Sequence, residues 1–363
     1  MKKKVGIITI NDFRNYGNRL QCYAVQNVLE NLGCMPENIY NVDCSKMKKV
    51  LGYIKNILYK LLNLKNYRVM DKRYSLFLQF NENIEFSKYK IYKDKFDVSI
   101  NDMYDSFIVG SDQVWNPNFS GQLVYFLPFA DGDKRISLSA SIGVNKIEED
   151  KYKVLLKSEL EKFKKISVRE DAGKKILENL NINKEISVLV DPTMLLNADE
   201  WDKVSRKPKQ ISKLSGKKYI LNYFLGNLSE ERKKEIQRIA TENDCEIINI
   251  LDKNDPFFVS GPSEFLWLEK NAFLICTDSF HSSVFAILYN RPFIVFNRED
   301  KTKSMNSRIE TLISKFNLKN REYNGKNITQ ENLKHDYTEA YKILEQERIK
   351  SKKFLKSALD IDE

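Results

Sequence analysis

The sequence contains few of the groups that usually mark a metal or redox centre. It has only two histidines, His281 and His335, and five cysteines. The cysteines form no CxxC pair and follow no zinc-ligand spacing, so we expect no metal site and a protein of the reducing cytoplasm. The five are Cys22, Cys34, Cys44, Cys245 and Cys276.

Long hydrophobic runs are also missing, since none approaches the ~18–20 residues of a membrane span. The start MKKKVGIITI resembles a signal peptide in its three lysines, but its apolar run is short and meets Asn11 and Asp12. We therefore expect a buried first strand over residues 5–10. A lysine-flanked leucine stripe over residues 51–62 predicts a helix that packs on its own domain or lies on a membrane surface. Membrane contact is therefore expected to be peripheral at most.

Nucleotide and nucleic-acid signatures are absent as well. There is no GxGxxG fingerprint, no P-loop and no zinc-finger or RNA-binding motif. The formal net charge of +10 is spread along the chain instead of concentrated in blocks. This distribution favours an anionic small ligand or membrane surface and argues against a nucleic-acid partner.

What the sequence does contain is a regular alternation of short apolar strands and amphipathic helices, which predicts the α/β class. At 363 residues it exceeds the ~250–300 that one core fills, so we expect two Rossmann-like domains facing a cleft. The predicted N-terminal domain covers residues 1–205, with a helical insertion near 46–95. A Lys- and Ser-rich linker precedes the C-terminal domain, 216–330, and a helical tail covers 331–363.

Polar side chains gather where the strand Phe273–Cys276 gives way to a helix. Ser279, His281 and Ser282 lie at this junction. A helix N-terminus at the carboxyl end of a parallel strand attracts anions, and a histidine there can carry a proton near neutral pH. The junction therefore predicts an anion site, and the plainer alternative is a capping serine with a core histidine.

Arginines of the first domain occupy similar strand exits. Arg14 and Asn15 lie in the loop NDFRNYGN after the first strand, and Arg169 follows the short strand 166–168. The planar guanidinium group binds phosphate or carboxylate in bidentate fashion, which predicts an anion contact. The alternative for Arg169 is pairing with Glu170, Asp171 or another acid.

The loop SDQVWN after the strand 106–110 combines an aromatic ring with hydrogen-bonding groups. Its residues are Ser111, Asp112, Gln113 and Trp115. Rings cover the apolar faces of sugars and polar groups bind their hydroxyls, so the loop predicts a sugar site. Trp115 equally fits a place in the core.

An ordered set of motifs resembles the polysaccharide pyruvyl transferase family. The resemblance runs from Val5 to about Leu318 and leaves the insertion and the tail without a counterpart. The motifs are NYGNRLQCYAVQ, FIVGSDQVWN, ISLSASIG, ISVRED, VLVDPTMLL, LNYFLG and TDSFHSSVFAILYNRPFIVF. The resemblance implies a fold like that of the B-type glycosyltransferases and the transfer of a pyruvyl group from phosphoenolpyruvate to two hydroxyls of a surface polysaccharide or its precursor. A cyclic ketal would form and phosphate would leave.

This reaction assigns roles to the candidate residues. Catalysis is assigned to His281, as the proton-transfer group, and Arg169. The expected donor contacts are Arg14, Asn15, Ser279, Ser282 and Arg308, and the expected acceptor contacts are Ser111, Asp112, Gln113 and Trp115. No cofactor is expected beyond phosphoenolpyruvate as co-substrate. A lipid-linked acceptor would place the enzyme at the inner face of the membrane, and the oligomeric state stays open.

Two other functions fit the same residues. A nucleotide-sugar glycosyltransferase would use Ser279, His281 and Ser282 to hold a nucleotide diphosphate. A non-catalytic sugar-binding subunit of a capsule-synthesis complex would keep Trp115 and tolerate the loss of His281, because fold alone does not determine activity.

Overall fold

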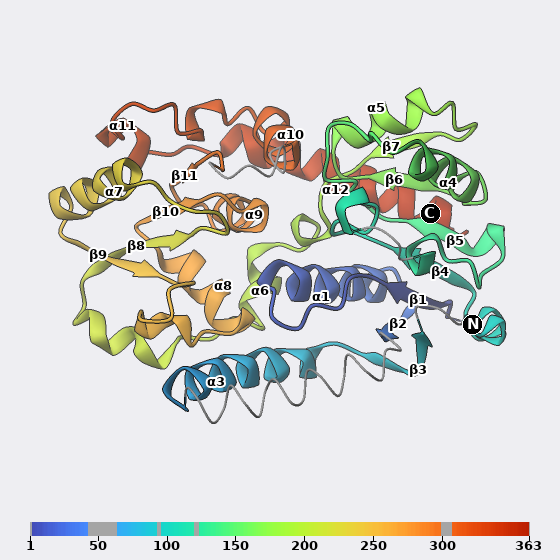
Figure 1. The fold of residues 1–363 in the computed structure, drawn as a ribbon, viewed down its shortest axis with the longest axis horizontal. Coiled ribbons are helices and arrows are strands. Elements are labelled where there is room, and N and C mark those ends of the chain that lie inside the picture. The colour runs from blue at the N-terminus through green and yellow to red at the C-terminus, as the bar shows by residue number, and fades with distance from the viewer. Residues whose placement is uncertain (1, 43–63, 93–95, 120–122, 299–306, 363) are drawn as a thin grey trace. The chain divides into compact units, whose positions relative to one another are not determined.

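The computed structural model describes residues 2–42, 64–92, 96–119, 123–298 and 307–362 (Figure 1). The described chain divides into two compact units. The first contains residues within 1–44, 82–196 and 344–363, and the second contains residues within 45–81 and 197–343. The leucine stripe at 51–62 lies outside the described residues. No described helix is long and apolar enough to cross a membrane.

The first unit is built on parallel strands, of which β1, β4, β5 and β6 are almost wholly buried. Five form one sheet in the order β3-β2-β1-β4-β5, and isolated bridges from Ile136 to Lys165 and from Ala140 to Val168 join its β5 edge to the parallel pair β6-β7. The strands are β1 (Lys4–Ile8), β2 (Met35–Val42), β3 (Phe86–Tyr92), β4 (Ser106–Val109), β5 (Arg135–Ser137), β6 (Ile166–Val168) and β7 (Ile186–Val188). This is the strand order of a doubly wound Rossmann sheet.

Three helices complete the βα alternation of this unit: α1 (Tyr16–Asn31), α4 (Asp150–Leu160) and α5 (Asp171–Asn179). α1 begins at Asn15, whose side chain accepts from the backbone N–H of Asn18, and its inner face buries Leu20, Val25 and Leu29. Two apolar clusters surround the sheet, and the later residues Leu355 and Leu359 join one of them. The helix and the core are therefore products of the same apolar periodicity.

The second unit repeats the pattern with a four-stranded parallel sheet, β11-β10-β8-β9, whose strands lie side by side in Figure 1. Its strands are β8 (Lys218–Tyr223), β9 (Cys245–Asn249), β10 (Leu274–Thr277) and β11 (Phe293–Val295). Its helices are α3 (Leu64–Phe80), α6 (Ala198–Asp202), α7 (Glu230–Glu242), α8 (Pro262–Asn271), α9 (Phe280–Leu288), α10 (Ser307–Lys315) and α11 (Gln330–Leu333). α12 (Thr338–Ala358) begins in this unit and ends in the first. The predicted α/β class with two Rossmann-like sheets is confirmed; the cleft stays a prediction.

The predicted helical insertion at 46–95 is wrong in its last part. Residues Phe86–Tyr92 form strand β3, which pairs in parallel with β2. The segment FSKYKIY alternates exposed lysines with inward residues such as Ile91, so its period is two and not 3.6. The segment was predicted as helix because its lysines resemble the polar face of an amphipathic helix. Lysines are also common on the open side of edge strands.

The division into units also differs from the predicted boundaries. α3 belongs to the second unit: Arg73 Nη1 donates to the carbonyl of Phe258 at 2.6 Å. The change of unit comes at 196/197, before the predicted linker, because Trp201 is fully buried against Phe285 with ring centroids 5.1 Å apart. The tail likewise divides, at 343/344 within α12.

Candidate active site

The first cluster of predicted residues lies at the carboxyl ends of β1 and β4. These strands are neighbours, but β2 flanks β1 on one side and β5 flanks β4 on the other, so the strand order reverses between them. Ligands of doubly wound sheets bind in the crevice at such a switch point. The loops that leave the two strands carry Arg14, Asn15, Ser111, Asp112 and Gln113.

Arg169 follows β6 and is buried between carboxylates, with 1% of its side chain exposed. Its Nη1 donates to Asp191 Oδ2, and its Nη2 lies 3.7 Å from Asp112 Oδ1. Burial acts to lower the pKa of Arg169, but the neighbouring Asp191 and Asp112 outweigh it and the pKa is raised. The structure therefore shows an arginine paired with acids of its own unit, and Arg169 holds Asp112 in place.

Both carboxylate oxygens of Asp191 accept hydrogen bonds from residues of its own unit. Besides Arg169, its Oδ2 accepts from Ser111 Oγ at 2.9 Å, and its Oδ1 accepts from the Thr193 N–H at 3.0 Å and from Thr193 Oγ1 at 2.7 Å. The Ser111 N–H donates to Gln21 Oε1 at 2.8 Å. Ser111, predicted to bind the acceptor, is fully buried and instead fastens its loop to Asp191 and to α1.

Asp112, in the loop after β4, is partly exposed. Its side chain is 15% exposed, whereas Asp191 and Glu170 are 1% and 0% exposed. Its Oδ2 accepts from Asn18 Nδ2 at 3.3 Å, so α1 and Arg169 hold the carboxylate from two sides. Asp112 is thus held in position from two sides and is partly exposed.

Gln113 packs beneath the loop that follows β5. Its Oε1 accepts from Asn116 Nδ2 at 2.5 Å, and a Cβ on Gly143 would lie 2.5 Å from the same oxygen. Gly143 has φ +69°, and its N–H donates to Glu170 Oε1 at 2.8 Å. Both the positive φ and the lack of room for a Cβ require a glycine at this position. The acceptor role of Gln113 stays a prediction.

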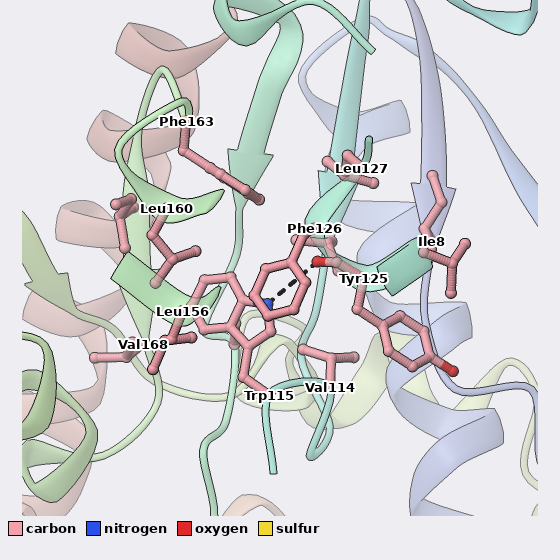
Figure 2. Close-up of a cluster of buried hydrophobic side chains, with 14 of the residues drawn as sticks. Ile8, Val114, Trp115, Tyr125, Phe126, Leu127, Leu156, Leu160, Phe163 and Val168 are labelled. Carbon is pink, nitrogen blue, oxygen red and sulfur yellow. Dashed lines mark hydrogen bonds between the residues drawn. The ribbon is translucent and has the colours of Figure 1, made fainter. Parts of the chain in front are cut away.

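The predicted sugar-stacking role of Trp115 is wrong. Its side chain is fully buried, and its Nε1 donates to the carbonyl of Tyr125 at 3.2 Å, as the dashed line in Figure 2 marks. The ring stacks on Phe126 at a centroid distance of 6.4 Å and meets the edge of Phe163 at 5.9 Å. Because a backbone acceptor satisfies the indole and apolar rings surround it, Trp115 takes the core alternative.

Arg14 and Asn15 differ in the surroundings of their side chains. Asn15 caps α1 through its side-chain oxygen, which accepts from the Asn18 N–H at 3.1 Å. Arg14 is exposed, and its backbone N–H donates to Asp12 Oδ1 at 2.9 Å. The donor-binding roles of both residues stay predictions.

The second cluster lies at the switch point of the second sheet, between β8 and β10. Asp278, just past β10, accepts from the N–H groups of Leu225 and Gly226 past β8, both at 2.7 Å. Arg298 Nε lies 3.3 Å from its Oδ2. Two backbone donors and an arginine therefore balance the one negative charge that precedes α9.

α9 begins at this point with Ser279 as its N-cap and His281 as its second residue. No acidic residue occupies its first turn, and Ser279 and His281 are 3% and 8% exposed. The first N–H groups of a helix have no acceptor within the helix, so its N-terminus carries partial positive charge. The geometry suits an anion beside an imidazole.

Two other predicted donor contacts have different surroundings. Ser282 is fully buried, and its Oγ donates to Glu269 Oε1 at 2.6 Å, so its assignment to the donor is wrong. As the third residue of α9, it is turned toward α8 instead. Arg308 is 6% exposed on α10, which packs on α9, and its donor role stays a prediction.

A sequence model of the family described as polysaccharide pyruvyl transferase matches residues 15–300. The chain belongs to the polysaccharide pyruvyl transferase family. In this pyruvyl transferase family member the matched region contains Ser279 and His281 of the second cluster and, in the first, every residue except Arg14; it also leaves out Arg308. Membership supports a transferase that acts on polysaccharide. No curated protein matches the sequence significantly.

Solved structures with similar chain traces are distant in sequence. The UDP-GlcNAc 2-epimerase from Methanocaldococcus jannaschii has 14% identity and a TM-score of 0.49, covering 94% of this chain and 92% of its own. The UDP-N-acetylglucosamine 2-epimerase from Rickettsia bellii has 13% identity and a TM-score of 0.46, covering 99% and 98%. The glycotransferase of kitacinnamycin has 11% identity and a TM-score of 0.36, covering 98% and 97%. Similarities of this size say nothing about the substrate of this chain.

Four residues of this family member were missed at the sequence level as parts of the site. Asn18 and Gln21 hold Asp112 and Ser111 from α1, and Asp191 and Glu170 fix the loops that follow β4 and β5. Two signals were present in the sequence. Asn18 and Gln21 are polar residues three apart near the start of α1, and Asp191 directly follows an apolar segment, residues 188–190.

Proposed function

We propose that this family member transfers the pyruvyl group of phosphoenolpyruvate to two hydroxyls of one sugar in a surface polysaccharide or its precursor. The product is a cyclic ketal, and phosphate is released. Family membership supports the transferase and the polysaccharide. The observation that carries the choice of donor is the start of α9, where a helix N-terminus without acidic residues adjoins an imidazole.

The reaction needs an anion site and proton transfer. One sugar hydroxyl adds to C2 of the enol, its O–H bond breaks and C3 gains a proton to become a methyl group. The C2–O bond to phosphate then breaks, and the second hydroxyl adds to C2 with loss of its proton. Two hydroxyl protons leave: C3 takes one, and the departing phosphate, which keeps the electron pair of the broken bond, takes the other.

The donor is assigned to the α9 switch point. Its phosphate or carboxylate accepts from the first N–H groups of α9 and from Ser279 Oγ, and His281 delivers the proton to C3. Asp278 does not oppose the anion, because two N–H groups and Arg298 neutralise it. Arg308, on α10 packed against α9, is assigned to the second anionic group of the donor, and the donor role of Arg14 stays a prediction.

The acceptor is assigned to Asp112. Its carboxylate is partly exposed and is held by Asn18 and Arg169, which fits a group that binds a sugar hydroxyl and orients it. Arg169 supports Asp112 and is not itself assigned to the donor. We further propose that the protein acts in the cytoplasm at the inner membrane face, which agrees with four free thiols at Cys22, Cys34, Cys245 and Cys276.

Phosphate release tests this function. The protein is incubated with phosphoenolpyruvate and a panel of galactosyl, mannosyl and glucosyl acceptors, with nucleotide sugars as the alternative donors. We expect phosphate release that depends on an acceptor, and a ketal methyl signal in the product. Release of nucleotide from a nucleotide sugar, with none of phosphate, would identify a glycosyltransferase instead.

His281→Gln is the decisive variant. Because a positioned acid or base contributes typically ~10²–10⁴-fold, we expect kcat for phosphate release to fall by about that factor while the protein stays folded. His335→Gln is the matched control, since the other histidine lies in the tail and contacts the carbonyl of Asn290. Equal activity of the two variants would remove His281 from the mechanism.

A further inference from the structure

Glu269 is a buried carboxyl group that the proposed chemistry does not use. It lies on α8 and is fully buried. Its Oε1 accepts from Ser282 Oγ at 2.6 Å, and its Oε2 has no hydrogen-bond partner among the described residues. Since no part of it reaches the surface, Glu269 cannot touch a substrate.

No cation compensates this carboxyl group within the described chain. The titratable groups near it are Tyr219 on β8 and Tyr289 just past α9, and burial raises the pKa of both hydroxyls. Tyr219 Oη donates elsewhere, to the carbonyl of Leu268 at 2.9 Å. Arg291 lies nearby but forms no ion pair with Glu269, and Lys270 pairs with Asp202.

Burial raises the pKa of Glu269 well above its usual range, and the hydrogen bond from Ser282 only partly opposes this effect. A buried carboxyl group without a counter-charge stays protonated because ionisation would place a bare charge in a low dielectric. As a neutral acid, Glu269 keeps a carbonyl oxygen that can accept the Ser282 hydroxyl. The pair is therefore a neutral hydrogen bond between α8 and α9.

Apolar side chains also contribute to the α8–α9 contact. Phe265 of α8 meets the ring of Phe285 of α9 edge to face, with centroids 6.1 Å apart. Apolar contacts are not directional, so they bring α9 against α8 without fixing its rotation or its height. A hydrogen bond is directional, and this one joins α8 to the residue next to His281.

We propose that Glu269 is a positioning residue: through Ser282 it fixes the first turn of α9 and thereby the imidazole of His281. The catalytic role of His281 rests on the proposed function. The effect of Glu269 on the position of the imidazole does not depend on that role. Two histidines in the whole chain make the idea easy to test, because a protein labelled with ¹³C at histidine Cε1 gives two imidazole signals. A His335→Gln variant assigns them.

Ser282→Ala is the main variant, with Glu269→Gln and Ser260→Ala as its comparisons. The glutamine keeps a neutral oxygen acceptor for Ser282. Ser260 is an equally buried serine of the same unit, and its Oγ donates to the carbonyl of Phe257 at 2.7 Å. We expect Ser282→Ala to move the pH titration of the His281 signal and leave that of His335 unchanged. It should lower kcat by up to about 100-fold, as a misplaced catalytic group does, with little change in the donor KM.

Glu269→Gln and Ser260→Ala should both retain the titration of His281 and the kcat of the wild type. An unchanged His281 titration in Ser282→Ala overturns the proposal, as does a Glu269→Gln variant that behaves like Ser282→Ala. The imidazole signals are read without substrate, so the positioning role is decided even if the wild type releases no phosphate from phosphoenolpyruvate. That second result would reject only the proposed function.

Discussion

Single residues at the first switch point are best understood through their partners. Arg169 and Asp112 were both singled out by their place after a strand, but their neighbours give them different roles. Arg169 is enclosed by Asp191 and Asp112, whereas Asp112 keeps an exposed edge. Residue type and strand position pointed to these two residues. Their partners, which follow β4, β6 and β7 or lie on α1, show which of the two is enclosed and which is partly exposed.

Asp191→Ala tests the buried ion pair. Removing one partner of a buried pair costs about 3–5 kcal/mol, since the remaining charge has lost its compensation. We expect the free energy of unfolding in urea to fall by about that amount, because Arg169, Ser111 and Thr193 all lose their acceptor. Asp150→Ala is the control, as this exposed acid pairs with Lys153 at the surface. Equal stability of the two variants would show that the network does not hold the unit together.

Trp115→Ala distinguishes a core residue from a sugar platform. The fully buried indole fills space between Phe126 and Phe163 (Figure 2), and truncating such a ring costs about 3–5 kcal/mol. We expect a lower melting temperature and an unchanged acceptor KM in the protein that remains folded. Trp115→Phe should lose less stability. A raised acceptor KM at unchanged stability would restore the sugar-binding role.

At the scale of elements, periodicity predicted most strands and helices to within a few residues. The strand 166–168 was predicted as it is observed, and the predicted strand 5–10 is observed as Lys4–Ile8. Buried parallel strands are continuous apolar runs, so a short stretch of sequence is enough to locate them. β3 was missed because an edge strand carries lysines on its open face, which resembles the polar face of a helix.

Partners across elements could not be predicted in the same way. Ser282 follows His281 directly, and a sequence pattern gives both the same place at a helix start. Only the packing of α8 on α9 shows that Ser282 is turned toward Glu269 and away from a ligand. Contacts of this kind join residues distant in sequence, and no local periodicity encodes them.

Glu269→Gln should change how stability depends on pH. The unfolded chain releases the Glu269 proton near pH 4.3, roughly the usual value, whereas the folded chain keeps it because burial raises the pKa. Wild-type stability therefore falls as pH rises above this value until the folded pKa is reached. Glutamine carries no proton to release, so the variant should equal the wild type near pH 4 and melt at a higher temperature at pH 7–8. A melting-temperature difference that is independent of pH would show that Glu269 is ionised in the folded protein.

At the scale of the whole molecule, each unit has one switch point and each switch point carries one predicted cluster. The βα alternation alone predicted two parallel sheets, and parallel sheets place every strand exit at one edge. The clusters after β1 and β4 and after β8 and β10 are therefore consequences of topology. The division at 196/197 was not predictable in this way, because it depends on how Trp201 packs and not on composition.

The charge of the whole chain leads to a prediction about membranes. A net charge of +10 and a pI near 9.0 favour anionic surfaces, where each lysine or arginine contributes about 1 kcal/mol, and no described helix can cross a bilayer. We expect the protein to float with phosphatidylserine vesicles at low salt and to be released at about 1 M salt, where the screening length is only ~3 Å. Vesicles of phosphatidylcholine alone are the control and should bind little. Flotation that resists salt would show that apolar insertion, and not charge, holds the protein on the membrane, and would contradict the electrostatic mode.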